Sequence, residues 1–166
     1  HGVTKGCGGT AARPLFCPDC GTKRIHAAIF LQRAKGLQRL YPDSPTFADV
    51  NESTVGKEAW GAVEACVKAG IISKDTKFRP NDVLSRIEGA TMIARAYIPD
   101  VDSYANAPTQ TFSDVPKSHW GYRFIEAMVR NCITTGTSNS TFAPNDPMPR
   151  IQFAALLARA AGYIEK

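Results

Sequence analysis

The sequence lacks any apolar run long enough to cross a membrane. Hydrophobic residues make up 43% of the 166 residues, but no run of them approaches the roughly 18 residues that a membrane-spanning helix needs. Charged residues make up 21%, an ordinary share for a chain that folds around a core of its own. We therefore expect a folded protein that does not insert into a membrane.

Runs of lysine and arginine are missing as well. The net charge is +5, but the basic residues are scattered among acidic ones and do not alternate with aromatic residues. This pattern argues against nucleic acid as a partner, whereas a mild attraction to acidic polymers or surfaces stays open.

Catalytic patterns are the third absence. His1, His26 and His119 do not combine with a nucleophile and a carboxylate in any Ser-His-Asp order. The chain also has no Gly-rich phosphate loop and no paired carboxylates in a sequence typical of a cleft. The sequence therefore predicts a protein that is not an enzyme and that carries no cofactor.

Cysteine, in contrast, is not scarce. The five cysteines, Cys7, Cys17, Cys20, Cys66 and Cys132, are more than a cytosolic structural domain usually carries, and secretion with one or two disulfides is the simplest explanation. Cys7 and Cys17 flank a single loop, so we predict a disulfide between them, worth roughly 2–3 kcal/mol in the chain-entropy model. We expect Cys66 and Cys132 to be buried small side chains. A bridge from one of them to Cys20 stays open.

The chain also contains an internal repeat. Three segments recur in two long copies: Thr46–Val50 with Thr111–Val115, Glu64–Ile71 with Glu126–Ile133, and Phe78–Asp82 with Phe142–Asp146. The N-terminal segment matches only the second half of a copy. We therefore divide the chain into a half repeat (1–40), a second repeat (46–98) and a third repeat (111–164). Linkers at 41–45 and 99–110 contain proline and are expected to add no secondary structure. These two and a half repeats must pack together to bury their apolar faces.

Two rival interpretations use the N-terminal cysteines. Cys7, Cys17, Cys20 and His26 are residue types that bind zinc, and Cys17-Pro-Asp-Cys20 has the spacing of a redox pair. The positions that match Cys20 in the other repeats carry aspartate, which argues against zinc. No thioredoxin-like strand pattern surrounds the pair. We therefore predict no metal site.

Each long repeat is typical of a helix, a loop and a second helix. Apolar spacing predicts the first helices near 56–69 and 118–131. Gly70 ends the first of these as a C-terminal cap, and Cys132 takes its place in the third repeat. Ser85-Arg-Ile-Glu88 has the form of a capping box and marks the start of a second helix. The predicted fold is mainly α.

Three arginines, Arg24, Arg86 and Arg150, stand at matched positions, each the same distance after a proline and at the head of an apolar helix. A cation there opposes the helix dipole, at a cost of roughly 0.3–1 kcal/mol. One interpretation is anion recognition, because a guanidinium beside the free N–H groups of a helix start can hold a carboxylate. The other is structural: each arginine pairs with the aspartate of a Phe-x-Asp-Val turn, Asp49 or Asp114.

The order of these motifs resembles the S-layer homology module. The best match runs from Phe112-Ser-Asp-Val through Trp120 to Gly162. The resemblance implies a helical fold with its repeats in a pseudo-threefold arrangement, on the extracellular surface of a bacterium. It also implies noncovalent anchoring to a cell-wall polysaccharide, often acidic or pyruvylated, in grooves between repeats. By position, the residues implied to bind the glycan are Arg24, Arg86, Arg150 and Trp120.

The second repeat departs from this pattern. It carries Glu58 where Trp120 would fall and has Trp60 nearby, because residues are inserted there. If a glycan binds, we expect the grooves to differ from one another and some to be inactive.

An alternative function is structural assembly, as a surface-layer or filament subunit that binds no glycan. The half repeat leaves an apolar helix face without its partner in the sequence: Ile25, Ala28, Ile29 and Phe30. Either a longer parent protein or another copy of the chain would complete it. On this interpretation the chain alone is not a stable monomer.

Overall fold

The chain divides into two compact units in the computed structural model, which describes residues 2–4, 6–10 and 13–164. Unit 1 holds the described residues up to Val83 together with Pro149–Ile151. Unit 2 holds Leu84–Met148 and the described residues from Gln152 onward. The boundary falls inside the expected second repeat, between its Phe-x-Pro turn and its arginine helix. His1, where the half repeat was expected to begin, lies outside the described residues.

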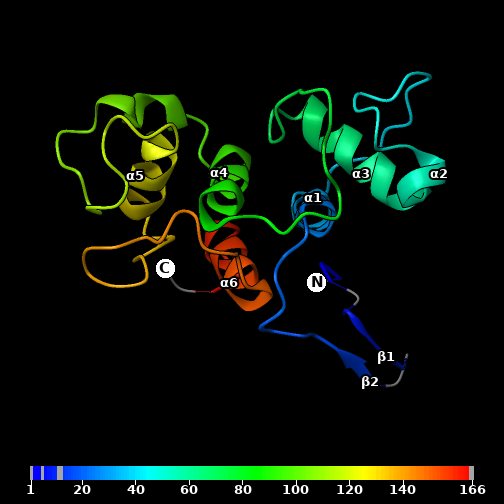
Figure 1. Ribbon diagram of the computed structural model, residues 1–166, viewed down its shortest axis with the longest axis horizontal. Coiled ribbons are helices and arrows are strands. Elements are labelled where there is room, and N and C mark those ends of the chain that lie inside the picture. The colour runs from blue at the N-terminus through cyan, green and yellow to red at the C-terminus, as the bar shows by residue number, and fades with distance from the viewer. Residues whose placement is uncertain (1, 5, 11–12, 165–166) are drawn as a thin grey trace. The chain divides into compact units, whose positions relative to one another are not determined.

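Unit 1 is built around helices α1 (Arg24–Ala34) and α3 (Lys57–Lys68), which pack against each other (Figure 1). A short helix, α2 (Glu52–Val55), precedes α3. Strands β1 (Gly8–Thr10) and β2 (Arg13–Leu15) form an antiparallel hairpin near the N-terminus. The rings of Phe47 and Phe78, both buried, lie 5.4 Å apart between their centroids in the core of this unit.

Unit 2 repeats this plan with helices α4 (Arg86–Tyr97) and α5 (Tyr122–Arg130), which also pack together. A 3-10 helix, η1 (Val101–Asn106), lies against α5 (Figure 1). Helix α6 (Arg150–Ala160) begins with residues that group with unit 1, and the rest of it belongs to unit 2. Phe112 and Phe142, with centroids 5.8 Å apart, match the aromatic pair of unit 1.

The prediction of a mainly α fold is confirmed, as are several of its boundaries. The side chain of Ser85 accepts a hydrogen bond from the Glu88 N–H, and the Glu88 carboxylate accepts one from the Ser85 N–H, so the capping box is present. Gly70 and Cys132 follow α3 and α5 with φ of 73° and 56°, both left-handed. The expected helix at 56–69 is α3. The pseudo-threefold arrangement of the repeats stays a prediction.

The expected helix at 118–131 begins later than its sequence indicated. Helix α5 starts at Tyr122 because the preceding residues form turns held by local backbone hydrogen bonds, from the His119 N–H to the Pro116 carbonyl and from the Tyr122 N–H to the His119 carbonyl. The β1–β2 hairpin and α2 were not predicted. Helix α2 occupies the insertion in the second repeat, where the Asn51 side chain caps its first turn.

The prediction that the 99–110 linker adds no secondary structure is wrong, since η1 lies within it. Polar contacts with α5 hold this linker in place: the Tyr122 hydroxyl donates to the carbonyls of Ala107 at 3.1 Å and Thr109 at 3.2 Å, and the Asn131 amide donates to the Tyr104 hydroxyl. The 41–45 linker, in contrast, forms no helix or strand.

A buried glutamate fixes the start of each long repeat. Glu64, 5% exposed, accepts hydrogen bonds from the N–H and the hydroxyl of Thr46 at 2.8 and 2.6 Å. Glu126, 1% exposed, accepts the same pair from Thr111 at 2.7 and 3.0 Å. Since a buried carboxylate is tolerated only when it is hydrogen-bonded, these pairs fix the Phe-x-Asp-Val segment at the same register on α3 and α5.

The apolar face of the half repeat is covered. Ile25, Ala28 and Phe30 are buried and Ile29 is half-buried, and α1 packs against α3. This face therefore gives no reason to require a second copy of the chain. Within the described residues, no helix is both long and apolar enough to span a bilayer.

Candidate functional site

Arg86, the first residue of α4, is a buried cation with partners inside unit 2. Its Nε–H donates to the carbonyl of Phe142 at 2.8 Å, and an Nη1–H donates to Gln152 Oε1. Its guanidinium carbon lies 4.8 Å from the centroid of the Phe142 ring, within cation–π range. With 5% of its surface exposed, Arg86 offers little surface to a ligand.

Arg24 makes the same contact from the first residue of α1. Its Nε–H donates to the carbonyl of Phe78 at 2.7 Å, and its guanidinium carbon lies 5.1 Å from the centroid of that ring. Arg24 is half-buried, so it is more accessible than Arg86.

Arg150, the first residue of α6, is 4% exposed and lies over two rings, at 5.3 Å from the centroid of Phe16 and 4.7 Å from that of Phe30. Its Nη2 donates to the Thr4 hydroxyl at 2.9 Å and to the Gly6 carbonyl at 3.2 Å. All three arginines therefore lie over the phenylalanine of a Phe-x-Pro turn, and in each case the turn belongs to a different repeat from the arginine.

Backbone hydrogen bonds accompany each arginine. The first two N–H groups of each arginine helix donate to two carbonyls of the same turn, over 2.8–3.1 Å: Arg24 and Ile25 to Asp82 and Pro80, Arg86 and Ile87 to Asp146 and Pro144, and Arg150 and Ile151 to Cys20 and Pro18. The expected mechanism of anion binding needed free N–H groups at these helix starts. These donors are already satisfied, which removes that mechanism.

Asp49 and Asp114 hold the same turns from the other side. Asp49 accepts hydrogen bonds from the N–H groups of Phe78 and Arg79, both at 2.8 Å. Asp114 accepts them from Phe142 at 2.9 Å and Ala143 at 2.7 Å. The structural interpretation had paired each aspartate with an arginine, whereas these hydrogen bonds go to the backbone. Each turn is thus held at its phenylalanine by an aspartate on the N–H and an arginine on the carbonyl.

Electrostatics agree with this description of the turns. Burial raises the pKa of the Asp49 carboxyl, but hydrogen bonds from the N–H groups of Phe78, Arg79 and Asp49 itself, together with the charge of Lys77, bring it below its ordinary value. Burial lowers the pKa of Arg86, while attraction to Asp146 and Asp114 opposes that shift. Asp114 therefore stabilises the Arg86 charge through space as well as holding the turn.

The aspartates offset a backbone cost. The residue before proline in each turn adopts a left-handed conformation, with φ of 54° at Cys17 and 57° at Arg79 and Ala143. Such a conformation costs about 1–2 kcal/mol for a residue other than glycine, whereas a hydrogen bond to a charged group contributes about 1.5–3 kcal/mol. The half repeat has no Phe-x-Asp-Val segment of its own. There the left-handed residue is Cys17, which a disulfide joins to Cys7.

Trp120 differs from the arginines because its indole is 57% exposed. It lies on the turn before α5, where the Gly121 N–H donates to His119 Nδ1 at 3.1 Å and the His119 ring lies 5.7 Å from the indole between centroids. A Cβ on Gly121 would approach the Ile87 side chain to 2.5 Å, so a larger residue there would displace that side chain. The turn thus presents an aromatic surface to solvent.

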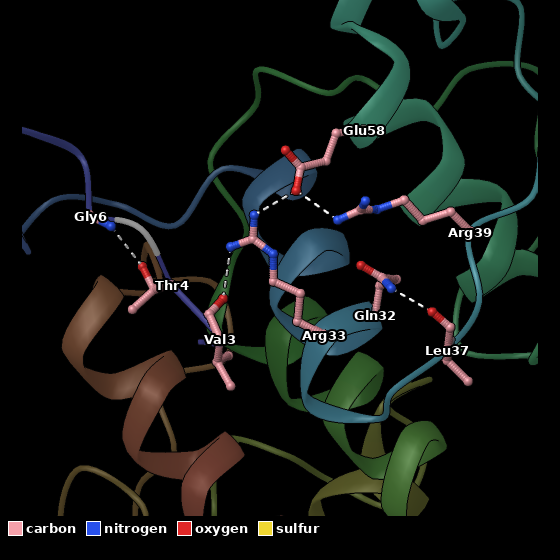
Figure 2. A network of polar contacts seen from close by, with 8 residues as sticks. All are labelled: Val3, Thr4, Gly6, Gln32, Arg33, Leu37, Arg39 and Glu58. Carbon is pink, nitrogen blue, oxygen red and sulfur yellow. Dashed lines mark hydrogen bonds and ion pairs between the residues drawn. The ribbon is translucent and has the colours of Figure 1, made fainter. Parts of the chain in front are cut away.

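The equivalent surface of the second repeat is a charge cluster. Glu58 accepts hydrogen bonds from Arg33 at 2.8 Å and Arg39 at 2.7 Å, and Arg33 also donates to the Val3 carbonyl at 3.1 Å. Figure 2 shows the two arginines reaching the same Glu58 oxygen, Arg33 from α1 and Arg39 from the segment that follows α1. The side chain at this position is therefore occupied by ion pairs and offers no aromatic face.

An open groove in unit 1 was missed by the sequence reasoning. It runs between the linker and the end of α3, and its lining includes Tyr41, Thr46, Glu64, Lys68 and Lys74. None of the four residues expected to bind glycan lines it. The proximity of Tyr41 to α3 depends on Gly61, where a Cβ would approach the Tyr41 ring to 2.5 Å, but glycine has no side chain that could mark such a contact in the sequence.

Only some of the expectations for the cysteines are confirmed. Cys7 and Cys17 form a disulfide, and Cys20, Cys66 and Cys132 are free. Cys66 is buried, and burial raises the pKa of its thiol to about 12. The expectation that Cys132 is buried is wrong: it is exposed because it occupies the left-handed position where α5 ends. The described residues contain no cluster of three or more potential metal ligands, and the disulfide removes two thiolates from the zinc set considered above.

The model of the S-layer homology domain matches residues 46–89 and 111–154, together more than half of the chain. A surface-layer 125 kDa protein of Lysinibacillus sphaericus is 36% identical over 101 residues, 60% of this chain and 8% of that protein. An S-layer protein of Bacillus thuringiensis subsp. finitimus is 25% identical over 159 residues, 95% of this chain and 19% of that one. A cellulosome-anchoring protein of Acetivibrio thermocellus is 28% identical over 89 residues, 54% of this chain and 19% of that one. The chain thus spans less than a fifth of each of these relatives.

Proposed function

Because the chain belongs to the S-layer homology domain family, a family of extracellular modules of the bacterial cell surface, we propose that it anchors an exported protein by binding an acidic cell-wall polysaccharide noncovalently. Anchoring by such modules involves no catalysis. Any enzymatic activity of the parent protein would then come from other domains.

The observation that carries this proposal is the exposed indole of Trp120, on a turn where the Gly121 N–H donates to His119 Nδ1. A flat aromatic face with a polar edge suits the C–H face of a sugar ring. Lys117 lies three positions earlier in the chain and is exposed, and its ammonium donates to the Pro108 carbonyl at 3.2 Å. The exposed indole supplies the stacking surface that recognition of a sugar requires.

The three arginines take a different part in the proposal. Arg86 and Arg150 are nearly fully buried, so they shape the Phe-x-Pro turns and are not expected to contact the glycan. Arg24, half-buried, is the best exposed of the three and could reach an acidic sugar while it holds Phe78. Glu58 is held in a charge cluster at the position that matches Trp120. This difference supports grooves that differ in glycan binding, with the third repeat as the one that binds.

Sedimentation with purified wall material tests the proposal. The protein should co-sediment with intact wall fragments and stay in solution when the fragments have been stripped of their polysaccharide. Equal binding to both materials would contradict polysaccharide as the ligand. Self-association of the protein in the absence of walls would instead favour the alternative function, assembly without glycan.

A further inference from the structure

Three cysteines meet at the first Phe-x-Pro turn, and we propose that they form a thiol–disulfide exchange site in which the Cys20 thiolate displaces Cys7 from Cys17. The disulfide joins Cys7 and Cys17, and Cys20 is a free, exposed thiol. Cys7 is exposed as well and Cys17 is half-buried. Exchange needs an accessible disulfide and a thiol within reach of one of its sulfurs.

The backbone brings Cys17 and Cys20 together. The Cys20 N–H donates to the Cys17 carbonyl at 3.3 Å, which closes a four-residue turn. The ends of such a turn lie within about 7 Å between Cα atoms, and disulfides join Cα atoms about 4.4–6.8 Å apart. The turn is therefore compatible with a Cys17–Cys20 bond.

The second repeat shows that side chains at these two positions do meet. Arg79 and Asp82 occupy the places of Cys17 and Cys20, and the Asp82 N–H donates to the Arg79 carbonyl at 3.2 Å. Their side chains form an ion pair, with 4.0 Å between Arg79 Nε and an Asp82 carboxylate oxygen. Cys17 shares the left-handed φ of Arg79. The turn thus allows the first and last side chains to interact.

Arg150 supplies a cation at the site. Its backbone N–H donates to the Cys20 carbonyl at 2.8 Å. Burial lowers the pKa of the Arg150 guanidinium, and attraction to Cys20 opposes that shift. The Arg150 cation therefore lies within electrostatic range of Cys20.

The exchange balances without any external reagent. The Cys20 thiolate attacks Cys17 Sγ, the Cys17–Cys20 bond forms, and the Cys7–Cys17 bond breaks. Cys7 leaves as a thiolate and takes up from solvent the proton that Cys20 had released. The covalent tie between Cys7 and Cys17, ten positions apart, is then lost, and the β1–β2 hairpin keeps only hydrogen bonds such as the one from the Cys7 N–H to the Leu15 carbonyl at 2.7 Å.

Disulfide mapping of the whole chain tests the exchange. The protein is incubated without oxygen in mildly alkaline buffer, quenched with acid, labelled with N-ethylmaleimide, and digested with chymotrypsin and Asp-N protease. Cleavage after Phe16 and before Asp19 separates all three cysteines. We expect maleimide on Cys7 and a Cys17–Cys20 disulfide in a fraction of the molecules. In Cys20→Ser the label on Cys7 should fall at least tenfold, whereas Cys132→Gly, which removes the other exposed thiol, should leave it unchanged.

A second variant tests the geometry directly. Cys7→Ala leaves Cys17 and Cys20 as free thiols, and oxidised glutathione should convert them to an internal disulfide as the main product. Two glutathione adducts in place of the internal bond would overturn the proposal, because they would show that the two sulfurs do not meet. Equal labelling of Cys7 in Cys20→Ser and in the unmodified protein would overturn it too, as would a Cys7 that is never labelled.

Discussion

Units 1 and 2 share the same internal frame and differ in what they present to solvent. Each has a buried glutamate on a threonine, a pair of buried phenylalanines, and a turn held by one aspartate and one arginine. In unit 2 the linker winds into η1 and covers α5, whereas in unit 1 the linker is extended and leaves an open groove beside α3. The comparison shows that hydrogen bonds to the backbone maintain the fold while exposed positions are free to change.

Position 58 and position 120 show this freedom most clearly. The matched position is the second residue of α3 in one unit, where it carries the ion-paired Glu58, and lies on the turn before α5 in the other, where it carries the exposed Trp120. Neither side chain takes part in the hydrogen bonds that hold the turns. A change of function at this position therefore leaves the frame intact.

The largest effect is expected from removing the buried arginine. Arg86→Ala leaves the Phe142 carbonyl without its donor and opens a space over the ring, so we expect a loss of about 2–4 kcal/mol in the free energy of unfolding. Arg24→Ala, at a half-buried position, should cost about 1–2 kcal/mol. Urea denaturation followed by circular dichroism measures both. Equal losses would show that the burial of the arginine does not set how much it stabilises its turn.

The aspartates should have the next largest effect. Asp49→Asn and Asp114→Asn each weaken two hydrogen bonds to a left-handed turn, so we expect a loss of about 1.5–3 kcal/mol near neutral pH. The pKa of Asp49 is lowered from 3.8, so its ionised form stabilises the fold above that pH and this stability is lost as the pH falls further. The difference between Asp49→Asn and the unmodified protein should therefore shrink below about pH 4. A difference that stays constant down to acid pH would contradict the role of the charge.

Substitutions at the ends of α3 and α5 are expected to change the stability of the protein in opposite directions. Gly70 and Cys132 occupy the same left-handed position, and nothing lies within 4 Å of a Cβ placed on Gly70. Gly70→Ala should therefore destabilise the protein by about 1 kcal/mol, and Cys132→Gly should stabilise it by about 0.5–1 kcal/mol. Thermal unfolding under reducing conditions compares them. Two changes of the same sign would show that side-chain contacts outweigh backbone conformation here.

The sequence predicts the frame well and the site less well, for physical reasons. The capping box at Ser85 and the end of α3 at Gly70 depend on neighbours in the chain, so local patterns suffice. Asp49 holds a turn about 30 residues away in the chain, and Arg86 holds another turn about 56 residues away. Their opposite charges suggested an ion pair between aspartate and arginine. In the structure, the aspartate and the arginine of each turn instead bond separately to the N–H and the carbonyl of the same phenylalanine. η1 was missed because its stability comes from α5 and not from its own sequence.

The most direct test of the account is the affinity of Trp120→Ala for soluble fragments of wall polysaccharide, measured by isothermal titration calorimetry beside Trp60→Ala. Trp60 is half-buried and donates to Glu64, so its loss should affect stability and leave the affinity unchanged. We predict at least a tenfold weaker affinity for Trp120→Ala, equivalent to about 1.4 kcal/mol, with an unchanged circular dichroism spectrum. A folded Trp120→Ala that binds as tightly as the unmodified protein would contradict the account.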